Sequence, residues 1–331
     1  MKNNILIIFL SLTIVCCKEN NTNTSTKKSK TEIIDNKKSY KGTGSITQGL
    51  AKTKIESLLS SNPKGSRIAG VGEINDSEKN IWTVPGINNF DNSPKAFDLY
   101  NENSGTTPSN LSEVDLNSVP VTEIDVDGEI ITGYIFADNY FELYINGKLI
   151  AVDPVPFTRF NSNIVKFKVS KPYTIALKVI DWEENLGLGS ENNRGKKFHP
   201  GDGGFIASFS DGTVTNNKWK AQTFYTAPIN DLSCLSEVGE KRLSSNCSTD
   251  GVDDGTNFYG IHWKIPENSF GVDFDDSKWP NATTYTEEVI GVKNKKAYIN
   301  FIEKFSGTGA EFIWSTNVVL DNEVIIRFKV K

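Results

Sequence analysis

The strongest candidates for binding chemistry lie in a stretch, residues 181–202, that is rich in acidic and aromatic side chains. A tryptophan ring can stack on the apolar face of a sugar, and carboxylates accept hydrogen bonds from hydroxyl groups. A further tryptophan stands free of the core-like motifs in the Ile-His-Trp sequence at 261–263. The residues predicted to bind carbohydrate are Trp182, Glu183, Glu184, His199, Asp202 and Trp263.

The same stretch has two other interpretations. In one, it is a solvated loop whose tryptophan covers the core. In the other, Asp181 and Glu184 are the carboxylate pair of a retaining glycoside hydrolase, which requires carboxyl groups about 5–5.5 Å apart. The sequence contains neither a Gly-x-Ser-x-Gly nucleophile motif nor a Gly-x-Gly-x-x-Gly dinucleotide motif, and His262 fits a structural role in a strand.

A second acidic cluster, Asp-Gly-Val-Asp-Asp-Gly at residues 250–255, suggests a metal site. Hard carboxylate oxygens on a tight loop are the ligands that Ca²⁺ takes. We therefore predict Asp250, Asp253 and Asp254 as candidate calcium ligands, with a solvated acidic turn as the alternative. The sequence indicates no cofactor other than this structural calcium ion.

The cysteines divide into two groups. Cys16 and Cys17 belong to the N-terminal segment, which leaves Cys234 and Cys247 for one disulfide. Such a bond persists in the oxidising compartments that exported proteins reach. Two free buried thiols are the alternative, and the histidines are too distant for a zinc site.

The first residues resemble a bacterial lipoprotein signal, in which the first mature residue is a lipid-modified cysteine. A charged start precedes an apolar run that is shorter than the roughly 20 residues of a membrane-spanning helix. The predicted signal peptide is 1–16 and the predicted lipidation site is Cys17, although Cys16 stands where a smaller residue is commoner. An ordinary signal peptide with two incidental cysteines is the alternative.

The Lys18-Glu19 pair also resembles a tag of Bacteroidetes surface lipoproteins, which implies a lipid-anchored outer-membrane protein at the cell surface. Residues 17–44 contain almost no apolar side chains and are predicted to form a disordered tether. The net charge of −5, spread along 331 residues, argues against nucleic-acid binding, which needs a basic surface.

The remaining chain shows the pattern of an all-β protein. Asn146-Gly147 between two apolar runs predicts a hairpin with a type I′ turn, and residues 164–169 alternate as in a half-buried strand. Many short strands with Gly, Asn and Asp turns indicate a jelly roll or another β-sandwich. Residues 45–127 show mixed signals and are predicted to be an irregular N-terminal region, with a short helix over 46–60.

Several motifs occur in an order that resembles galactose-binding-like jelly-roll modules, which are appended to bacterial glycoside hydrolases. They are the hairpin region 137–150, the strand at 203–209 and the Phe-Asp-Asp-Ser-x-Trp turn at 274–279. The resemblance covers 128–331 and implies a jelly-roll β-sandwich over that range. The stretches 182–202 and 226–257 are longer than in those modules, and the fold alone does not fix a ligand.

These observations favour a non-catalytic surface lipoprotein that binds a glycan or glycoprotein and is attached to the membrane through its N-terminal lipid. A carbohydrate-active hydrolase or lyase and a structural envelope protein are the alternatives. Among the tryptophans, Trp219, Trp279 and Trp314 occupy core-like motif positions. The better binding candidates, Trp82, Trp182 and Trp263, would have to lie on one concave surface.

Overall fold

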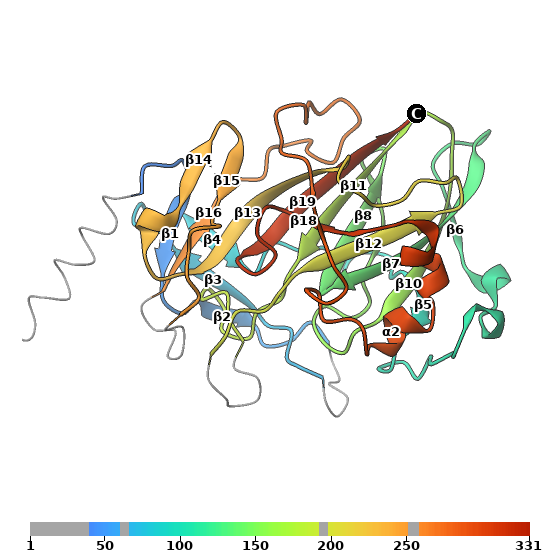
Figure 1. The fold of residues 1–331 in the computed structure, drawn as a ribbon, viewed down its shortest axis with the longest axis horizontal. Coiled ribbons are helices and arrows are strands. Elements are labelled where there is room, and N and C mark those ends of the chain that lie inside the picture. Colours follow the sequence, from blue (N-terminus) through green and yellow to red (C-terminus); the bar gives the residue numbers. More distant parts are fainter. Residues whose placement is uncertain (1–39, 60–65, 192–197, 251–257) are drawn as a thin grey trace, which may run out of the picture.

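The computed structural model describes residues 40–59, 66–191, 198–250 and 258–331 (Figure 1). Within them, the chain forms an all-β sandwich of two large sheets, with two smaller sheets beside it. Sheet 1 contains, in spatial order, β1 (Ser45–Gln48), β16 (Tyr259–His262), β13 (Lys220–Ile229), β19 (Asp321–Val330), β11 (Tyr173–Ile180), β8 (Tyr140–Ile145) and β9 (Lys148–Val152). The fold class predicted from the strand pattern is confirmed as an all-β sandwich.

Sheet 2 packs against one face of sheet 1. Its strands are β17 (Thr283–Tyr285), β18 (Phe312–Trp314), β12 (Gly204–Phe209), β7 (Glu129–Asp138), β10 (Ser162–Val169) and β5 (Phe97–Tyr100), and β6 (Val121–Glu123) pairs with β10. The short helices are α2 (Lys296–Ile299), η1 (Leu111–Glu113), η2 (Leu116–Ser118), η3 (Leu232–Cys234), η4 (Ile302–Lys304) and η5 (Ser306–Thr308). No helix of the described residues is long and apolar enough to cross a membrane.

The main core lies between the two sheets and contains large aromatic and branched side chains from both. Phe141 and Leu177 enter it from sheet 1, and Phe136 and Phe205 enter it from sheet 2. In β10 the predicted alternation is confirmed, because Phe167 is buried while the lysines on either side are partly exposed. Trp219 and Trp314 are fully buried, as their motif positions predicted.

Local turn chemistry fixes the predicted hairpin. Asn146 and Gly147 both have positive φ angles, 50° and 80°, and Ile145 pairs with Lys148 across the turn. Asparagine and glycine tolerate this left-handed backbone conformation better than other residues. The hairpin joins β8 to β9 at one edge of sheet 1.

The helix expected over 46–60 is wrong. This segment forms β1 and β2 (Lys52–Ile55), separated by Gly49 at a φ of 83°. β1 pairs antiparallel with β16, with Ile46 opposite Ile261. Pairing at the edge of sheet 1 therefore overrides the weak helical preference of the segment.

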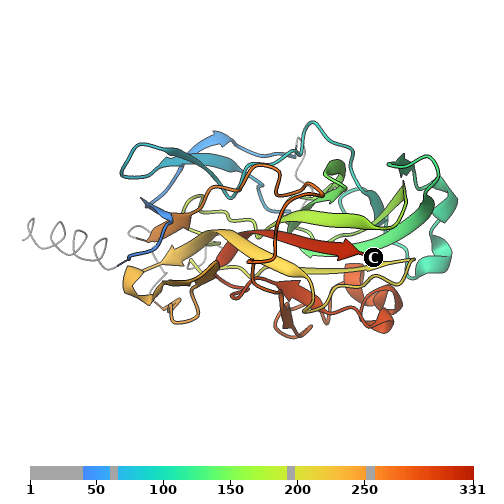
Figure 2. The same ribbon diagram turned by 90° about the horizontal axis from the view of Figure 1, so that it is seen from above.

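A third layer covers part of the outer face of sheet 1, which is the face away from sheet 2. It is a small sheet of β2, β3 (Val71–Asn75) and β4 (Ile81–Val84), and Figure 2 shows it on one side of the sandwich. Val71 packs with Tyr140 and Ile180 of sheet 1, and Ile74 packs with Tyr225. The N-terminal region thus supplies strands that lie directly against the sandwich.

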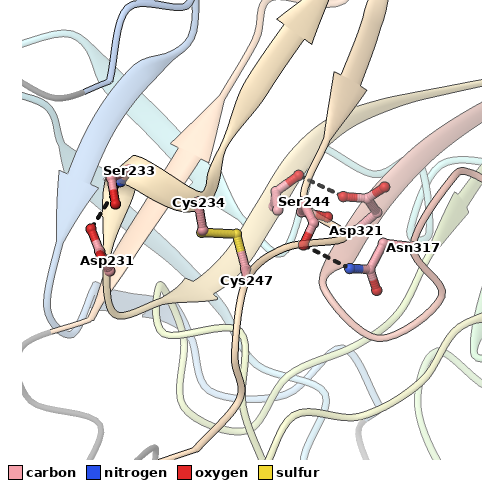
Figure 3. Close-up of a disulfide and its surroundings, with 8 residues drawn as sticks. Asp231, Ser233, Cys234, Ser244, Cys247, Asn317 and Asp321 are labelled. Carbon is pink, nitrogen blue, oxygen red and sulfur yellow. Dashed lines mark hydrogen bonds between the residues drawn. A yellow bond between two sulfur atoms is a disulfide. The ribbon is translucent and has the colours of Figure 1, made fainter.

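The predicted disulfide between Cys234 and Cys247 is confirmed (Figure 3). It encloses the hairpin of β14 (Ser236–Val238) and β15 (Lys241–Leu243). Asn317 donates a hydrogen bond to the Ser244 carbonyl at 3.4 Å, which links the base of the hairpin to the loop before β19. The hairpin is therefore fixed to the body of the protein close to Trp263, which it contacts.

Candidate functional site

A groove of about 420 Å³ lies between the small sheet and the outer face of sheet 1. Its lining comes from β4, from four strands of sheet 1 and from the loop after β16. The lining residues are Asn80, Ile81, Trp82, Thr83, Ile87, Lys178, Phe224, His262, Trp263, Lys264, Ile265, Phe270 and Glu323. Because the lining includes aromatic rings and opposite charges, this groove is the candidate functional site.

Trp82 is supported by a stack of rings. Its ring lies 5.1 Å from that of His262, and the His262 ring lies 4.5 Å from that of Tyr225, at an interplanar angle of 7°. The Trp82 indole N–H donates to the Asp76 carboxylate at 3.0 Å. Burial lowers the pKa of His262 to about 3, against a raising effect of Asp76, so this histidine is neutral at physiological pH.

Trp263 is held by the disulfide-bonded hairpin. Its indole N–H donates to Glu237 Oε1 at 3.1 Å, and the Arg242 guanidinium lies 4.5 Å from its ring centroid. The hydroxyl of Tyr40 and the backbone N–H of Thr43 donate to the same Glu237 oxygen. Burial raises the pKa of Glu237, but the hydrogen bonds that its carboxylate accepts outweigh burial and lower the pKa below its ordinary value.

Phe270 is a further aromatic residue of the groove lining. It stacks on Tyr144 with a centroid distance of 4.0 Å and an interplanar angle of 12°. The Tyr144 hydroxyl donates to Glu142 at 2.7 Å. Trp82, Trp263 and Phe270 are therefore each fixed by contacts with neighbouring side chains, so their positions are set before any ligand arrives.

Two opposite charges lie on neighbouring strands of sheet 1 and line the groove. Lys178 Nζ is 4.0 Å from Glu323 Oε1, and the ammonium also donates to the Ile87 carbonyl at 2.6 Å. Glu323 Oε1 is buried and has no hydrogen-bond partner in the part of the chain that the structure describes. Burial raises the pKa of Glu323 to about 7; Lys178 lowers it, and Glu142 raises it further.

A larger hollow of about 890 Å³ lies elsewhere, beside the end of β5 and the start of α2. Arg159 forms an ion pair with Glu102 there, and the Tyr100 hydroxyl donates to Glu102 at 3.1 Å. The Lys295 ammonium lies 4.5 Å from the Phe160 ring centroid. Much of the polar lining is thus engaged within the protein, so this hollow is a weaker candidate than the groove.

The sequence-predicted residues separate in the structure, and of them Trp263 lines the groove. Trp182 is buried in a core cluster, where its indole N–H donates to the Gly70 carbonyl at 3.0 Å. Glu183 is also buried and accepts hydrogen bonds from the backbone of Gly187 and Gly189. Both side chains therefore have structural roles: their binding groups are used inside the protein.

Glu184, His199 and Asp202 lie near Glu191, outside the groove lining. Arg67 contacts Glu184 at 3.7 Å and also pairs with Glu191. The His199 backbone exchanges two hydrogen bonds with that of Glu191, and the charge of Glu191 acts on Asp202. Glu184 is therefore held by an arginine, and neither it nor His199 nor Asp202 lines the groove.

The predicted metal and lipid sites are covered only in part. Asp250 is described, whereas Asp253, Asp254 and Cys17 lie outside the described residues. Within the described ranges, no group of three His, Cys, Asp or Glu side chains is placed to hold a metal ion.

Sequence reasoning missed the charged pair and Phe270. A usable signal exists for Lys178, which is the one charged residue of β11. A charged residue in such a strand must face away from the core, which identifies the outer face of sheet 1. Glu323 gives no such signal, because β19 also contains Asp321, Arg327 and Lys329. Trp82, on the opposite wall of the groove, comes from β4, and its position depends on how segments that are distant in the sequence pack.

Buried carboxyl groups predict that acidification from pH 8 to pH 5 stabilises the fold. Burial raises the pKa of Glu183 and of Glu323 to about 7, and that of Asp202 and of Asp321 to about 6. Each folded-state pKa exceeds its unfolded value, so the folded state binds more protons in that window. The stability is present at low pH and is lost as the pH rises through about 6 and then 7.

The opposing group is His262, whose lowered pKa makes the folded state bind fewer protons below pH 6.5. Each group changes the free energy of unfolding by about 1.4 kcal/mol per pH unit while it titrates in one state only. One histidine cancels the effect of one carboxyl group, so the remaining carboxyl groups still make the protein more stable at low pH. Thermal melts followed by circular dichroism at pH 8, 7, 6 and 5 should show a melting temperature higher by at least about 5 °C at pH 5. The rise should shrink in the Glu183→Gln/Glu323→Gln variant. A melting temperature that is highest at pH 8 would contradict the assignment.

Comparisons with known proteins do not assign this chain to a family. The chain matches no protein-family model, no curated protein and no solved structure.

Proposed function

We propose that this protein binds carbohydrate, without catalysis, in the groove between the small sheet and sheet 1. The observation that carries the proposal is the pair of tryptophans, Trp82 and Trp263, held beside the Lys178–Glu323 pair in one concave site. Ring faces can stack on the apolar face of a sugar, while an ammonium donates to hydroxyl oxygens and a carboxylate accepts from hydroxyl groups. The volume lies within the range of about 300–1,000 Å³ that ligand pockets have.

Rigidity supports the same proposal. Both indole N–H groups are already used, by Asp76 and Glu237. The partly exposed Trp82 therefore offers ring surface rather than a hydrogen bond, whereas Trp263 is 7% exposed and forms part of the groove wall. A ligand that stacks on fixed rings loses little of its binding free energy to ordering the protein. The site is therefore suited to a stiff ligand with alternating apolar and hydroxyl faces, which describes a sugar chain.

The location belongs to the proposal as well. We propose that Cys17 carries a lipid, that residues 17–44 connect it to the sandwich, and that the groove faces outward from the outer membrane. The signal-like first 16 residues support this, and the motif order supports a galactose-binding-like jelly roll for 128–331. A short tether would let an anchored protein hold polysaccharide near the cell.

The test is a Trp82→Ala variant in a protein that begins at residue 18. We expect the purified protein to be retarded in an affinity gel that contains a neutral polysaccharide. Trp82→Ala should weaken binding at least tenfold, because removing a central aromatic contact typically costs about 2 kcal/mol or more. Trp82→Phe, which keeps a ring, should retain most of the affinity and is the matched control. The proposal fails if no polysaccharide retards the protein, or if Trp82→Ala binds like the original chain.

A further inference from the structure

We propose that the ligand of the groove is a sugar carried on an extended peptide, and that the peptide backbone pairs with the free edge of β4. This inference rests on the proposed function and names its partner as a glycoprotein. It begins from the position of β4, which is the last strand of the small sheet and pairs with β3 on one side. The other edge of β4 is unpaired among the described residues.

The pairing with β3 decides which backbone groups of β4 are free. The Asp76 N–H donates to the Asn80 carbonyl at 3.1 Å, and from there the two strands pair in a constant register. Residues of an antiparallel pair alternate between exchanging backbone hydrogen bonds and turning their N–H and C=O groups away. The backbone groups of Trp82 therefore face β3, whereas Ile81 and Thr83 each turn an N–H and a C=O toward the free edge.

This free edge lies on the groove. Four successive residues, 80–83, line the groove, although successive side chains of a strand point to opposite faces of the sheet. The Trp82 ring faces sheet 1, where it stacks on His262, so the side chains of Ile81 and Thr83 point the other way. These two residues reach the groove along the strand edge, and Ile81 is 63% exposed. Neither makes a backbone hydrogen bond on that side to any described residue.

The sequence of β4 leaves this edge open to pairing. An unpaired strand edge is a template for another strand, and proteins block such edges with charged residues or proline. The opposite edge of the small sheet is β2, which is exposed along its length and carries Lys52 and Lys54. β4 reads Ile-Trp-Thr-Val and has neither a charge nor a proline. The small sheet is therefore protected at one edge and available at the edge that lines the groove.

An extended peptide is the partner that fits this edge. The free N–H and C=O groups of Ile81 and Thr83 recur about 7 Å apart, which is the two-residue repeat of a strand. A peptide strand presents donors and acceptors with the same repeat, as in the strand addition that many peptide-binding domains use.

The aromatic side of the groove then determines which peptide binds. In an antiparallel pairing, the ligand residue opposite Trp82 forms a non-hydrogen-bonded pair, in which the two side chains lie closest. That residue faces sheet 1 as Trp82 does, so its side chain enters the groove, while its neighbours point away. A sugar on this residue can stack on an aromatic ring. The edge and the rings together therefore fit a sugar-bearing threonine, a residue that also favours extended backbone.

The experiment compares ligands by isothermal titration calorimetry with the protein that begins at residue 18. The glycopeptides are short chains of alanine and threonine in which one central threonine carries galactose, mannose or N-acetylgalactosamine. Each is compared with the same peptide without sugar and with the methyl glycoside of its sugar. We expect a glycopeptide to bind at least tenfold more tightly than either. Tenfold corresponds to about 1.4 kcal/mol, which a few backbone hydrogen bonds can supply.

Thr83→Pro should remove the contribution of the peptide alone. Position 83 turns its N–H away from β3, and an edge strand tolerates proline at such a position. The glycopeptide should bind at least tenfold more weakly, because the proline ring replaces the donor and fills its space. The affinity for the methyl glycoside should change less than twofold, which shows that the groove is intact. Thr83→Val keeps the N–H and is the matched control, with unchanged affinity for the glycopeptide.

N-methylation of the peptide tests the same hydrogen bonds without changing the protein. Methyl groups on the amides of the two residues that flank the sugar-bearing threonine should weaken binding at least tenfold, because these N–H groups face β4. A methyl group on the amide of the sugar-bearing threonine itself should change the affinity less than twofold, because that N–H points away.

The outcomes separate the inference from the proposed function. A glycopeptide that binds no more tightly than its methyl glycoside would overturn the inference and leave carbohydrate binding in place. Glycopeptide binding that is insensitive to both Thr83→Pro and N-methylation would also overturn the inference. Equal affinity for the peptide with and without its sugar, together with no retardation by any polysaccharide, would overturn the proposed function as well.

Discussion

Replacing Asp276 with alanine should lower the free energy of unfolding by about 3–5 kcal/mol, because it leaves a buried guanidinium without its counter-charge. Arg327 is fully buried, and its Nε donates to Asp276 Oδ2 at 2.8 Å. The other guanidinium nitrogens donate to the carbonyls of Ser269 and Gly271. These carbonyls can hold the group in place, but they carry no formal charge to balance it.

Urea unfolding followed by circular dichroism measures this loss as a lower midpoint. Asp275→Ala is the control, because the Asp275 side chain is exposed and accepts a hydrogen bond from the Ser277 backbone at 3.0 Å. Its midpoint should stay close to that of the original chain. In the Asp276→Leu/Arg327→Met variant most of the lost stability should return, since apolar residues can replace a buried ion pair. Equal midpoints for Asp276→Ala and Asp275→Ala would show that the ion pair contributes little.

The same contacts explain why the Phe-Asp-Asp-Ser-x-Trp motif could be recognised from the sequence. Phe274 packs against Trp279 at 5.1 Å and lies under the Arg327 guanidinium at 5.2 Å. The motif is thus a compact local structure with a fixed spacing. Its partner Arg327 is 51 residues away from Asp276 and could not be predicted, because the contact depends on the position of β19 in sheet 1.

The fold was predictable where local rules decide the structure. Alternating burial in β10 and the positive φ angles at Asn146 and Gly147 follow from a few adjacent residues. The failure at 46–60 has the opposite cause: β1 forms through pairing with β16, which lies more than two hundred residues later. Secondary structure at a sheet edge depends on the neighbouring strand as much as on the segment itself.

The site was predictable only in part for the same reason. Residue types led to Trp263, and Trp82 was among the freer tryptophans, but the sequence could not show that these rings share one groove. The acidic residues after β11 were predicted to contact a ligand, but Glu183 accepts a hydrogen bond from the backbone of the glycine-rich loop that follows it. Whether an acidic side chain faces a ligand or its own loop depends on the loop conformation, which spacing does not specify.

Trp182→Ala is the second substitution with a large expected effect, about 3–5 kcal/mol of lost stability. Trp182 is 1% exposed, packs edge-on against Tyr140 at 5.7 Å and donates to the Gly70 carbonyl at 3.0 Å. It therefore joins the end of β11 to the small sheet, just before Val71. Removing the ring leaves a cavity between two layers and an unpaired backbone carbonyl.

The measurement is urea unfolding of Trp182→Ala and Trp182→Phe, followed by circular dichroism. Phenylalanine restores most of the buried volume but has no N–H donor for the Gly70 carbonyl, so its midpoint should fall between those of the original chain and Trp182→Ala. Trp82→Ala is the informative contrast, because Trp82 is only partly buried and should cost less stability while removing ligand binding. If Trp182→Ala instead unfolded like the original chain and lost carbohydrate binding, the ring would belong to the site. The small sheet would then need another contact to hold it on sheet 1.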